Sequence, residues 1–330
     1  MKNNIYVISN DKIYRDKDNN LYGPNNDLDN ILHSLKSKFK VHLIARKTKI
    51  KNKFRLGRIE IFEKKNLMKN MKIFMISLTP YNFFMLIYFL YIKRVSVTGH
   101  IYFRSDGFLE YKYRYGWFGY FVYFLMFTLI KKKLNFISCS KNFTNIDCNS
   151  IVYPSECDEE WFLNRKSPKL DKIYFLYVGR LTYDKGSEFL RLLFKSQIKK
   201  NFKFQIVGID KKDFSKQQNP SFDFSGIISE KKEMIKIYDQ CNIFLLPSYI
   251  EGFPKVINEC LARHRPVIIF NEISYVVNER EGIFKCERDI DDLFNLSNYI
   301  IDNYQMIQDK IRSNKDYTKL NFQKDLSEKI

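Results

Sequence analysis

The segment YVGRLTYDKGSEFL, residues 177–190, joins an apolar strand to an amphipathic helix through a turn that carries Gly179, Arg180, Lys185 and Gly186. Glycine lets the backbone turn tightly after the strand and approach a ligand closely at the start of the helix. In parallel α/β sheets, ligands bind beyond the carboxyl ends of the strands, where helix N-termini direct N–H groups outward. A guanidinium fork and an ammonium group at this place suit a diphosphate. The alternative interpretation of the two cations is a surface salt-bridge pair.

Short apolar strands alternate with helix-length segments along the whole chain. Near-continuous apolar strands separated by helical patterns are typical of parallel sheets that are covered on both faces. We therefore predict two doubly wound α/β domains. The predicted strands of the first domain are residues 4–9, 40–46, 71–77, 100–104, 135–140 and 150–155, and those of the second are 172–179, 203–208, 222–226, 242–248 and 266–270.

The polar stretch LNRKSPKLDK, residues 163–172, contains Pro168 and has no hydrophobic periodicity. We interpret it as the linker between the two domains. The predicted domains are residues 1–165 and 166–315. Residues 316–330 are polar and helical in character, and we expect a C-terminal helix there that can pack back toward the first domain.

Composition limits the class of protein and of partner. The 56 Lys and Arg residues outnumber the 37 Asp and Glu residues, which gives a net charge of +19 and favours anionic partners. Lys, Asn, Ile, Phe and Tyr are abundant together, so codon bias accounts for part of this charge. No zinc-finger, basic-zipper or RNP signature is present, so we do not expect nucleic-acid binding. The six cysteines form no CxxC pair, so we expect reduced thiols and no metal site.

Two apolar runs raise the question of a membrane. Residues 83–92 and 117–130 are shorter than the roughly 20 residues that a transmembrane helix needs. The first interpretation is a pair of buried helices. The alternative is interfacial helices, because Lys93 and Arg94 follow the first run and residues 131–133 are all lysine. The N-terminus lacks the features of a signal peptide, so we expect a cytoplasmic protein, attached in the alternative case to an anionic membrane surface.

A second cluster of polar residues follows a strand in LLPSYIEGFPKVINECLARHRPVIIF, residues 245–270. The strand ends at a loop that carries Glu251, and Pro254 stands at a plausible first turn of the next helix. Glu259 lies eight residues after Glu251, within that helix. We expect Glu251 to bind sugar hydroxyls and Glu259 to reach a ribose, while the helix amides around Val256 face phosphate.

These two clusters resemble motifs of the retaining glycosyltransferases of the GT-B fold, known as glycosyl transferases group 1 or glycosyltransferase family 4-like proteins. Glu251 through Glu259 is similar to the E-x7-E motif of that family. Gly179, Arg180, Lys185 and Gly186 match its strand-G-R-x4-K-G motif. Further similarity is found in order along the chain, in residues 152–162, 205–208 and 224–248.

The resemblance implies two Rossmann-like domains that face a cleft. It also implies a retaining, metal-independent hexosyltransferase that uses a UDP- or GDP-linked sugar as substrate and needs no cofactor. The acceptor would be a glycan or a lipid-linked glycan of bacterial capsule, lipopolysaccharide or O-antigen synthesis. The site residues that it implies are Arg180 and Lys185 at the diphosphate, Glu251 with the amides of Gly252 and Phe253 at the donor sugar, Glu259 at the ribose, and residues 226–228, including Ile228, near the base.

The first domain departs from the family pattern. The family has a double-glycine loop after the first strand, whereas this chain offers Gly23 in YGP, after a polar insertion at residues 10–20. We assign Gly23 to donor binding. The family also has a histidine in the middle of this domain, where the chain reads FRSDGF, so Asp106 is the predicted acceptor-positioning residue and His100 is its competitor.

The second domain departs from the pattern at two places. His264 stands where the family has glycine, in a left-handed position that histidine tolerates. The glycine pair that follows P-V-I is missing from FNEISYVV, residues 270–277. These departures leave open a second interpretation, in which the chain is a noncatalytic glycosyltransferase-like subunit that binds a partner enzyme or membrane. The D-x-D triplets at 27–29 and 289–291 are interpreted as helix N-terminal residues instead of metal ligands.

Overall fold

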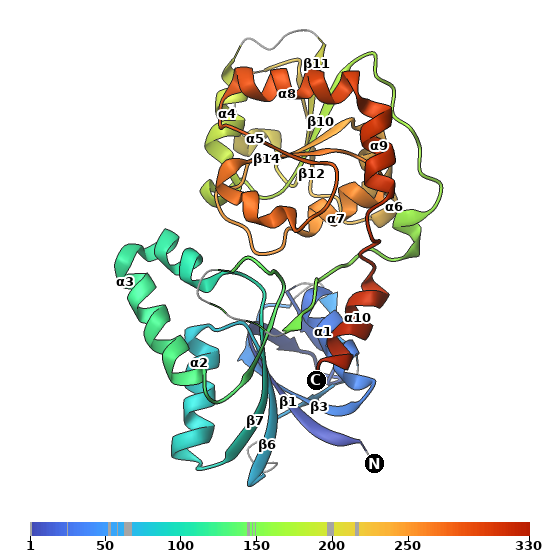
Figure 1. The fold of residues 1–330 in the computed structure, drawn as a ribbon. Helices are drawn as coiled ribbons and strands as arrows, with labels where there is room; N and C mark the ends of the chain where they lie inside the picture. The colour runs from blue at the N-terminus through green and yellow to red at the C-terminus, as the bar shows by residue number, and fades with distance from the viewer. Residues whose placement is uncertain are drawn as a thin grey trace. The chain divides into compact units, whose positions relative to one another are not determined.

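The computed structural model describes residues 2–24, 26–51, 54–57, 59–62, 68–143, 146, 148, 150–196, 201–214 and 218–330 (Figure 1). It divides into two compact units. Unit 1 comprises Met1–Glu156 together with Thr318–Ile330, and unit 2 comprises Cys157–Tyr317. The chain therefore passes from unit 1 into unit 2 and back again.

Unit 1 contains a parallel sheet whose strand order is β5-β3-β1-β6-β7-β8-β9. Numbered along the chain without the hairpin strands described below, this order is 3-2-1-4-5-6-7, so the direction of winding reverses between β1 and β6. That reversal is the place where open α/β sheets bind ligands. The strands are β1 (Asn3–Arg15), β3 (Phe39–Lys47), β5 (Glu60–Ile61), β6 (Asn70–Ile76), β7 (Ser96–Phe103), β8 (Asn135–Ser138) and β9 (Ser150–Ile151).

The predicted polar insertion at residues 10–20 belongs mostly to a strand. The pairing of β1 with β3 shifts between Ser9 and Lys12, and β1 then continues to Arg15. It turns back into β2 (Leu21–Gly23), which pairs antiparallel with β1 and with β4 (Phe54–Arg55). A bulge followed by a hairpin therefore occupies the place where the sequence suggested a loop.

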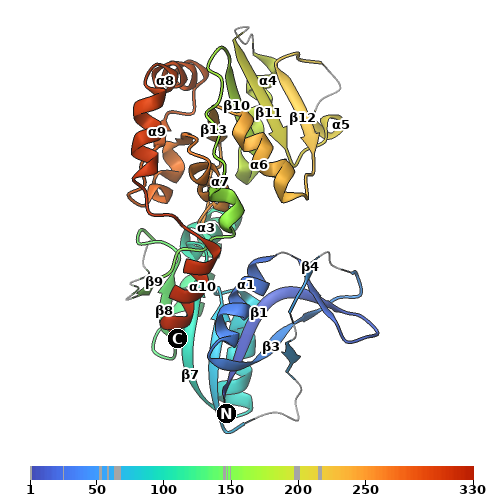
Figure 2. The ribbon, with the colours of Figure 1, turned by 90° about the vertical axis from the view of Figure 1, so that its right-hand side faces the viewer.

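The helices of unit 1 include one from the end of the chain. α10 (Lys319–Glu328) lies beside α1 (Asn26–Lys36) in both ribbon views (Figures 1 and 2). Lys38 Nζ donates to the carbonyl of Ser327 at 2.7 Å, and Phe322 is buried with its ring centroid 6.3 Å from that of Tyr102 in β7. The other helices are α2 (Pro80–Ile87), a π-helical turn η2 (Tyr88–Ile92) and α3 (Gly107–Ile130). The C-terminal helix is thus part of unit 1.

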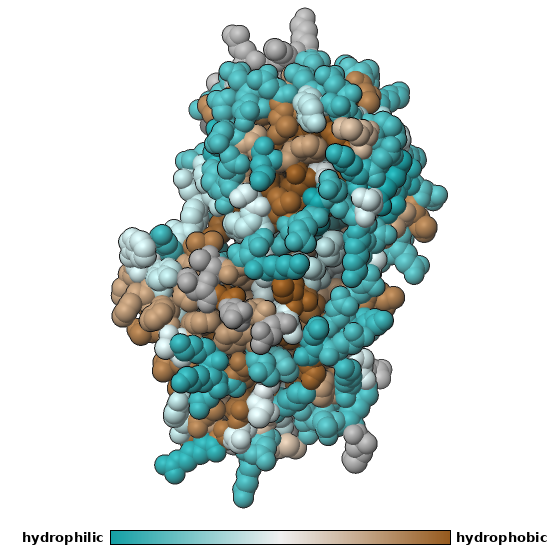
Figure 3. Space-filling view, in the orientation of Figure 1, coloured by the Kyte–Doolittle hydropathy of each residue, from teal (hydrophilic) through white to brown (hydrophobic). Residues whose placement is uncertain are grey.

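α3 exposes a long apolar face. Gly116 breaks the helix at φ 64° and ψ −155°, a backbone conformation that essentially only glycine adopts. Beyond this kink, Trp117 is 70% exposed and Phe118 is 76% exposed. The other exposed members of this α3 apolar face are Tyr113, Tyr115, Phe121, Phe124, Leu125 and Leu129. Hydrophobic residues gather on the surface over α3 at the left of Figure 3.

The prediction that both apolar runs are buried is wrong for one face of each. In residues 83–92, Phe83 and Phe89 are buried, but Phe84 and Ile92 are exposed. A run without polar residues cannot signal which side meets solvent, because helical periodicity is then invisible. Among the described residues, none of the helices combines the length and the apolar character required to cross a membrane.

Unit 2 contains a second parallel sheet, of order β12-β11-β10-β13-β14-β15 (Figure 2). Counted within the unit, this is the 3-2-1-4-5-6 order, with its switch point between β10 and β13. The strands are β10 (Ile173–Val178), β11 (Phe202–Val207), β12 (Phe222–Gly226), β13 (Ile243–Leu246), β14 (Val267–Phe270) and β15 (Ile283–Cys286). The α-helices are α4 (Ser187–Lys195), α5 (Lys211–Phe214), α6 (Lys231–Gln240), α7 (Lys255–Ala262), α8 (Ile290–Asp302) and α9 (Tyr304–Arg312).

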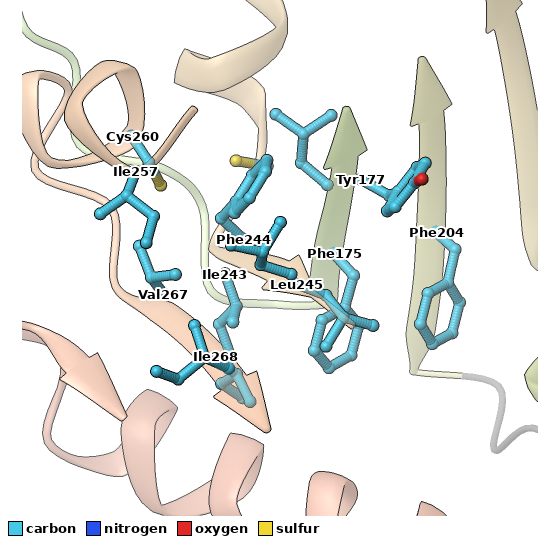
Figure 4. Close-up of a cluster of buried hydrophobic side chains, with 14 of the residues drawn as sticks. Phe175, Tyr177, Phe204, Ile243, Phe244, Leu245, Ile257, Cys260, Val267 and Ile268 are labelled. Carbon is cyan, nitrogen blue, oxygen red and sulfur yellow. The ribbon is translucent and has the colours of Figure 1, made fainter. Parts of the chain in front are cut away.

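The core of unit 2 explains why its strands read as continuous apolar runs. Each residue of β13 and β14 is buried, because helices cover both faces of the sheet. Figure 4 shows Ile243, Phe244 and Leu245 of β13 between side chains from β10, β14 and α7. The strand ends are therefore held on a rigid base.

The predicted linker at 163–172 is anchored to unit 2, and the unit boundary lies earlier, between Glu156 and Cys157. Arg263 is 1% exposed and binds both carboxylate oxygens of Asp239 at 2.9 and 2.8 Å. It also donates to the carbonyls of Trp161 and Leu163. The absence of periodicity that suggested a linker thus reflects an irregular segment fixed by a buried guanidinium.

Candidate functional site

Two loops meet at the switch point of unit 2. The β10–α4 loop, residues 179–186, follows β10, and the β13–α7 loop, residues 247–254, follows β13. Gly186 has φ 78°, and a Cβ atom there would lie 2.1 Å from the carbonyl oxygen of Pro247. The amide of Tyr249 donates to the carbonyl of Asp184 at 2.9 Å. Glycine at 186 is therefore required for the two loops to touch.

Two of the predicted site residues are joined across these loops. Lys185 Nζ lies 2.6 Å from Glu251 Oε1, and Ser248 Oγ donates to the same oxygen at 2.7 Å. The Lys185 side chain is 24% exposed and the Glu251 side chain is 9% exposed. The pair places an ammonium group and a carboxylate together at the carboxyl edge of the sheet, where the sequence expected a diphosphate and a sugar.

The other predicted residues of the β10–α4 loop lie at the end of β10. Arg180 is exposed, and its carbonyl accepts a hydrogen bond from Tyr177 Oη at 2.8 Å. A Cβ atom at Gly179 would lie 2.6 Å from the same hydroxyl oxygen. Gly179 thus lets Tyr177 fix the backbone from which the Arg180 guanidinium extends.

α7 begins directly after the β13–α7 loop. Pro254 is its N-cap residue and, being a proline, has no polar side chain that could accept from the first amides of the helix. Val256 lies in the first turn, whereas Phe253 is buried, with the Arg280 guanidinium 5.0 Å from its ring centroid. Gly252 and Phe253 therefore offer a sugar only their backbone groups.

Glu259 lies in the middle of α7 and is held by a tyrosine. Tyr238 Oη donates to Glu259 Oε2 at 2.8 Å. Burial raises the pKa of Glu259 above its usual value, while the Tyr238 hydrogen bond and the Lys255 ammonium group act in the opposite direction. The ribose-binding role of Glu259 stays a prediction.

The segment predicted to lie near the base follows β12. Gly226 has φ 61°, Ile227 is 75% exposed, and Ile228 packs partly against the core of unit 2. His264 has φ 55°. The prediction that His264 takes a left-handed position is thus confirmed.

Two residues that the sequence analysis missed hold the β13–α7 loop. Tyr275, in the 3-10 helix η5 (Asn271–Val277), accepts a hydrogen bond from the Glu251 amide at 3.0 Å and donates to the Glu251 carbonyl at 2.7 Å. Arg288 donates to the carbonyls of Pro247 and Ser248 at 2.8 and 3.2 Å. The only signal in the sequence was the missing glycine pair in residues 270–277.

Unit 1 has a cavity of about 510 Å³ at its own switch point. Its walls come from the β1 bulge, the start of α2 and both halves of kinked α3, and the lining includes Asn10, Ser77, Thr79, Ser105, Tyr115 and Phe118. Ser77 has φ 60°, a left-handed conformation that is held by a hydrogen bond from its amide to the Tyr102 carbonyl. Strained backbone beside a cavity is typical of a binding site.

The two predicted acceptor residues do not line this cavity. Asp106 is 2% exposed and caps α3, accepting from the Leu109 amide at 3.1 Å. His100 lies in β7, and burial lowers its pKa. The carboxylate in the cavity wall is Glu110, which accepts from Ser105 Oγ at 2.8 Å and pairs with Arg114 at 3.1 Å.

Gly23, predicted at the donor, lies in β2 opposite Phe54 of β4. A Cβ atom there would meet the Leu56 side chain at 3.1 Å. Its surroundings are those of a buried hairpin residue in unit 1.

A metal site was not expected. Within the part of the chain that the structure describes, no group of three or more His, Cys, Asp or Glu side chains is placed to hold an ion. Asp289, the first residue of the second D-x-D triplet, accepts from the amides of Asp291 and Asp292 at the start of α8. Its interpretation as a helix N-cap is confirmed.

Known proteins resemble this chain in two ways: in the sequence of unit 2 and in the overall fold class. Residues 172–303 match the family described as Glycosyl transferases group 1. The capsular polysaccharide biosynthesis glycosyltransferase CapM of Staphylococcus aureus is 34% identical over 135 residues, which are 36% of this chain. That alignment covers 35% of the relative, so the chain matches about a third of its length.

Solved structures match over nearly the whole chain. Anabaena HepE in complex with UDP has a TM-score of 0.66 at 12% identity, covering 100% of this chain and 99% of that one. Sucrose-phosphate synthase from Thermosynechococcus elongatus has a TM-score of 0.64 at 14% identity, covering 98% and 96%. These likenesses confirm the predicted GT-B class of two parallel α/β domains. Residues 172–303 are therefore similar to the group 1 glycosyltransferases, the family that the Lys185 and Glu251 motifs indicated.

Proposed function

We propose that the protein is a retaining, metal-independent glycosyltransferase that moves a hexosyl group from a nucleoside-diphosphate sugar to an acceptor in bacterial surface polysaccharide synthesis. The observation that carries this proposal is the pairing of Lys185 with Glu251 at the switch point of unit 2. The relation to CapM, which is named for capsular polysaccharide biosynthesis, supports the polysaccharide class.

In this proposal the main catalytic contribution is stabilisation of the leaving group. Departure of the diphosphate leaves an oxocarbenium-like sugar and concentrates negative charge on the phosphate oxygens. Lys185 and Arg180, together with the first amides of α7 near Val256, face that charge. When donor binds, Lys185 exchanges its contact with Glu251 for one with phosphate.

Other residues hold the rest of the donor. Glu251, released from Lys185, accepts hydrogen bonds from the sugar hydroxyls, and the backbone of Gly252 and Phe253 supports the same ring. Glu259 binds the ribose, and the base lies near Ile228. We propose uracil as the first donor base to test, in the form of UDP, because HepE, which shares the fold, is known in complex with UDP.

We assign the acceptor to the cavity of unit 1. A glycan or lipid-linked glycan needs both hydrogen-bonding groups and flat apolar surfaces. Glu110 with Arg114 supplies the first, and Tyr115 with Phe118 supplies the second. This assignment replaces Asp106 and His100, whose side chains lie elsewhere.

The α3 apolar face is proposed to rest on an anionic membrane surface at the cytoplasmic side. Aromatic residues beside lysines favour the boundary between headgroups and acyl chains. Sedimentation with phosphatidylglycerol-containing vesicles tests this: binding by the wild type should be lost in Trp117→Ser with Phe118→Ser, and kept in the control Leu192→Ser, which alters an exposed leucine of unit 2. Equal sedimentation of all three proteins would contradict the membrane role.

The experiment that tests the reaction site is a thermal-shift panel of UDP, GDP, ADP and CMP. A ligand that binds only the folded state raises the melting temperature. We expect one nucleoside diphosphate to stabilise the wild type and the control Lys236→Ala, but not Lys185→Ala. No shift with any nucleotide would favour the noncatalytic subunit, for which the missing glycine pair is the motivation.

Transfer itself is tested with the donor that the panel selects. Glu251→Ala and Lys185→Ala should each abolish sugar transfer, because one binds the sugar and the other the leaving group. The anomeric configuration of the product, read by nuclear magnetic resonance, decides between retention and inversion. Unchanged transfer in both variants would refute the site.

A further inference from the structure

The loop that carries Glu251 is held from one side by residues that follow β14. Tyr275 makes two hydrogen bonds to a single residue. Its hydroxyl oxygen accepts from the Glu251 amide at 3.0 Å, and its hydroxyl group donates to the Glu251 carbonyl at 2.7 Å. One phenol therefore fixes both backbone groups of Glu251. A rotation of the Glu251 backbone would break both hydrogen bonds at once.

A second side chain holds the start of the same loop. Arg288 donates to the Pro247 and Ser248 carbonyls, and its guanidinium lies 3.8 Å from the ring centroid of Tyr249. Glu272 accepts from Arg288 Nε at 2.7 Å. These two carbonyls lie four and three residues before Glu251, so Arg288 holds the beginning of the loop, while Tyr275 holds the backbone of Glu251 itself.

The β10–α4 loop, on the side of the site proposed for the diphosphate, is held by other contacts. The Arg180 carbonyl is bound by Tyr177, and the Lys185 segment rests on Pro247 through Gly186. Neither contact passes through Tyr275. The Tyr275 hydroxyl thus bears on the part of the site that meets the sugar, and not on the part that meets the phosphates.

We propose that Tyr275 is a positioning residue for the donor sugar, which sets the Glu251 carboxylate and the following amides at the sugar hydroxyls. This rests on the proposed function of the site. Residues 270–277 lack the glycine pair of the family pattern, and in this chain the segment acts on the sugar indirectly, through the Glu251 backbone.

The proposal predicts a selective loss. In the proposed function a nucleoside diphosphate contacts the residues assigned to phosphate, ribose and base but not Glu251, whereas the corresponding nucleotide sugar also contacts Glu251. In Tyr275→Phe, the affinity for UDP should stay within about twofold of the wild type, while the affinity for UDP-glucose falls by roughly tenfold, which is the effect of losing one well-placed hydrogen bond or two weak ones. GDP with GDP-mannose and ADP with ADP-glucose form the rest of the panel.

Tyr304→Phe is the matched control. Tyr304 Oη donates to the Asn242 carbonyl at 2.8 Å, also a buried bond from a phenol to the backbone, but at the amino end of β13. It should change thermal stability without changing either affinity. Isothermal titration calorimetry measures both ligands, and thermal unfolding measures the folded state of each variant.

Each outcome decides the matter. Equal weakening of UDP and UDP-glucose, or no change in either, overturns the positioning role of Tyr275. A wild type that binds none of the three pairs refutes the proposed function, and this inference with it. If Tyr275→Phe does not fold, Tyr275→His, which removes the same hydroxyl and keeps a planar polar ring, must show the selective loss of nucleotide-sugar affinity, and equal losses would again overturn the proposal.

Discussion

Gly186→Ala tests whether the contact between the two loops builds the site. The new Cβ atom would stand 2.1 Å from the Pro247 carbonyl oxygen, and real Cβ atoms keep at least 3.0 Å from such atoms, so the β13–α7 loop has to move by about 1 Å. A left-handed alanine costs about 1–2 kcal/mol. Overpacking adds about 1–3 kcal/mol. We therefore expect Gly186→Ala to lower the free energy of unfolding by about 2–5 kcal/mol.

The assay compares Gly186→Ala with Gly226→Ala in thermal unfolding. Gly226 also has positive φ, but a Cβ atom there meets only the flexible end of Asp210. For a unit of this size, 1 kcal/mol corresponds to about 3 °C, so we expect a fall of roughly 6–15 °C for Gly186→Ala and roughly 3–6 °C for the control, which carries only the cost of a left-handed alanine. A 1 Å displacement of Glu251 should also slow sugar transfer by about 100-fold. Equal stability losses, or full activity in Gly186→Ala, would refute the reasoning.

Three further predictions concern other parts of the molecule. In the proposed function the ionised Glu259 carboxylate binds ribose, so nucleotide affinity should be complete above its raised pKa and fall as the pH drops through it. Tyr238→Phe removes an interaction that lowers this pKa, so calorimetry should show the fall at a higher pH. Glu110→Gln should raise the KM for acceptor about tenfold and leave nucleotide affinity unchanged, and a change confined to nucleotide affinity would argue against the acceptor cavity. Arg263→Met leaves Asp239 without its bidentate partner, so urea denaturation should show a loss of about 3–5 kcal/mol, and a loss under 1 kcal/mol would mean that water replaces the guanidinium.

The sequence predicted five of the six strands of the second sheet and its switch point, because apolar strands and glycine turns are local signals, but it missed β15. It also placed Lys185 and Glu251 in one site. It could not predict that the two would touch, since 66 residues separate them and the contact depends on how the two loops pack. The ion pair is therefore information that only the structure provides.

The sequence was less informative where a side chain contacts a distant part of the backbone and where polar and apolar residues did not follow one clear period. Tyr275 reaches Glu251 through a phenol, and such a contact has no periodic signature. Asp106 was expected at the acceptor and is found as the N-cap of α3, a role that an aspartate directly before a helix typically takes. Residues 10–20 read as a loop because hairpin strands at a sheet edge carry polar residues.

The return of α10 to unit 1 affects the order in which the chain can fold. Unit 2 is continuous from Cys157 to Tyr317, so all of its residues are synthesised before unit 1 is complete. Phe322, which packs on Tyr102, belongs to a segment that emerges after all of unit 2. During synthesis the surface of unit 1 that α10 covers stays exposed until the second unit is made, so unit 2 can complete its core first although its residues follow those of unit 1.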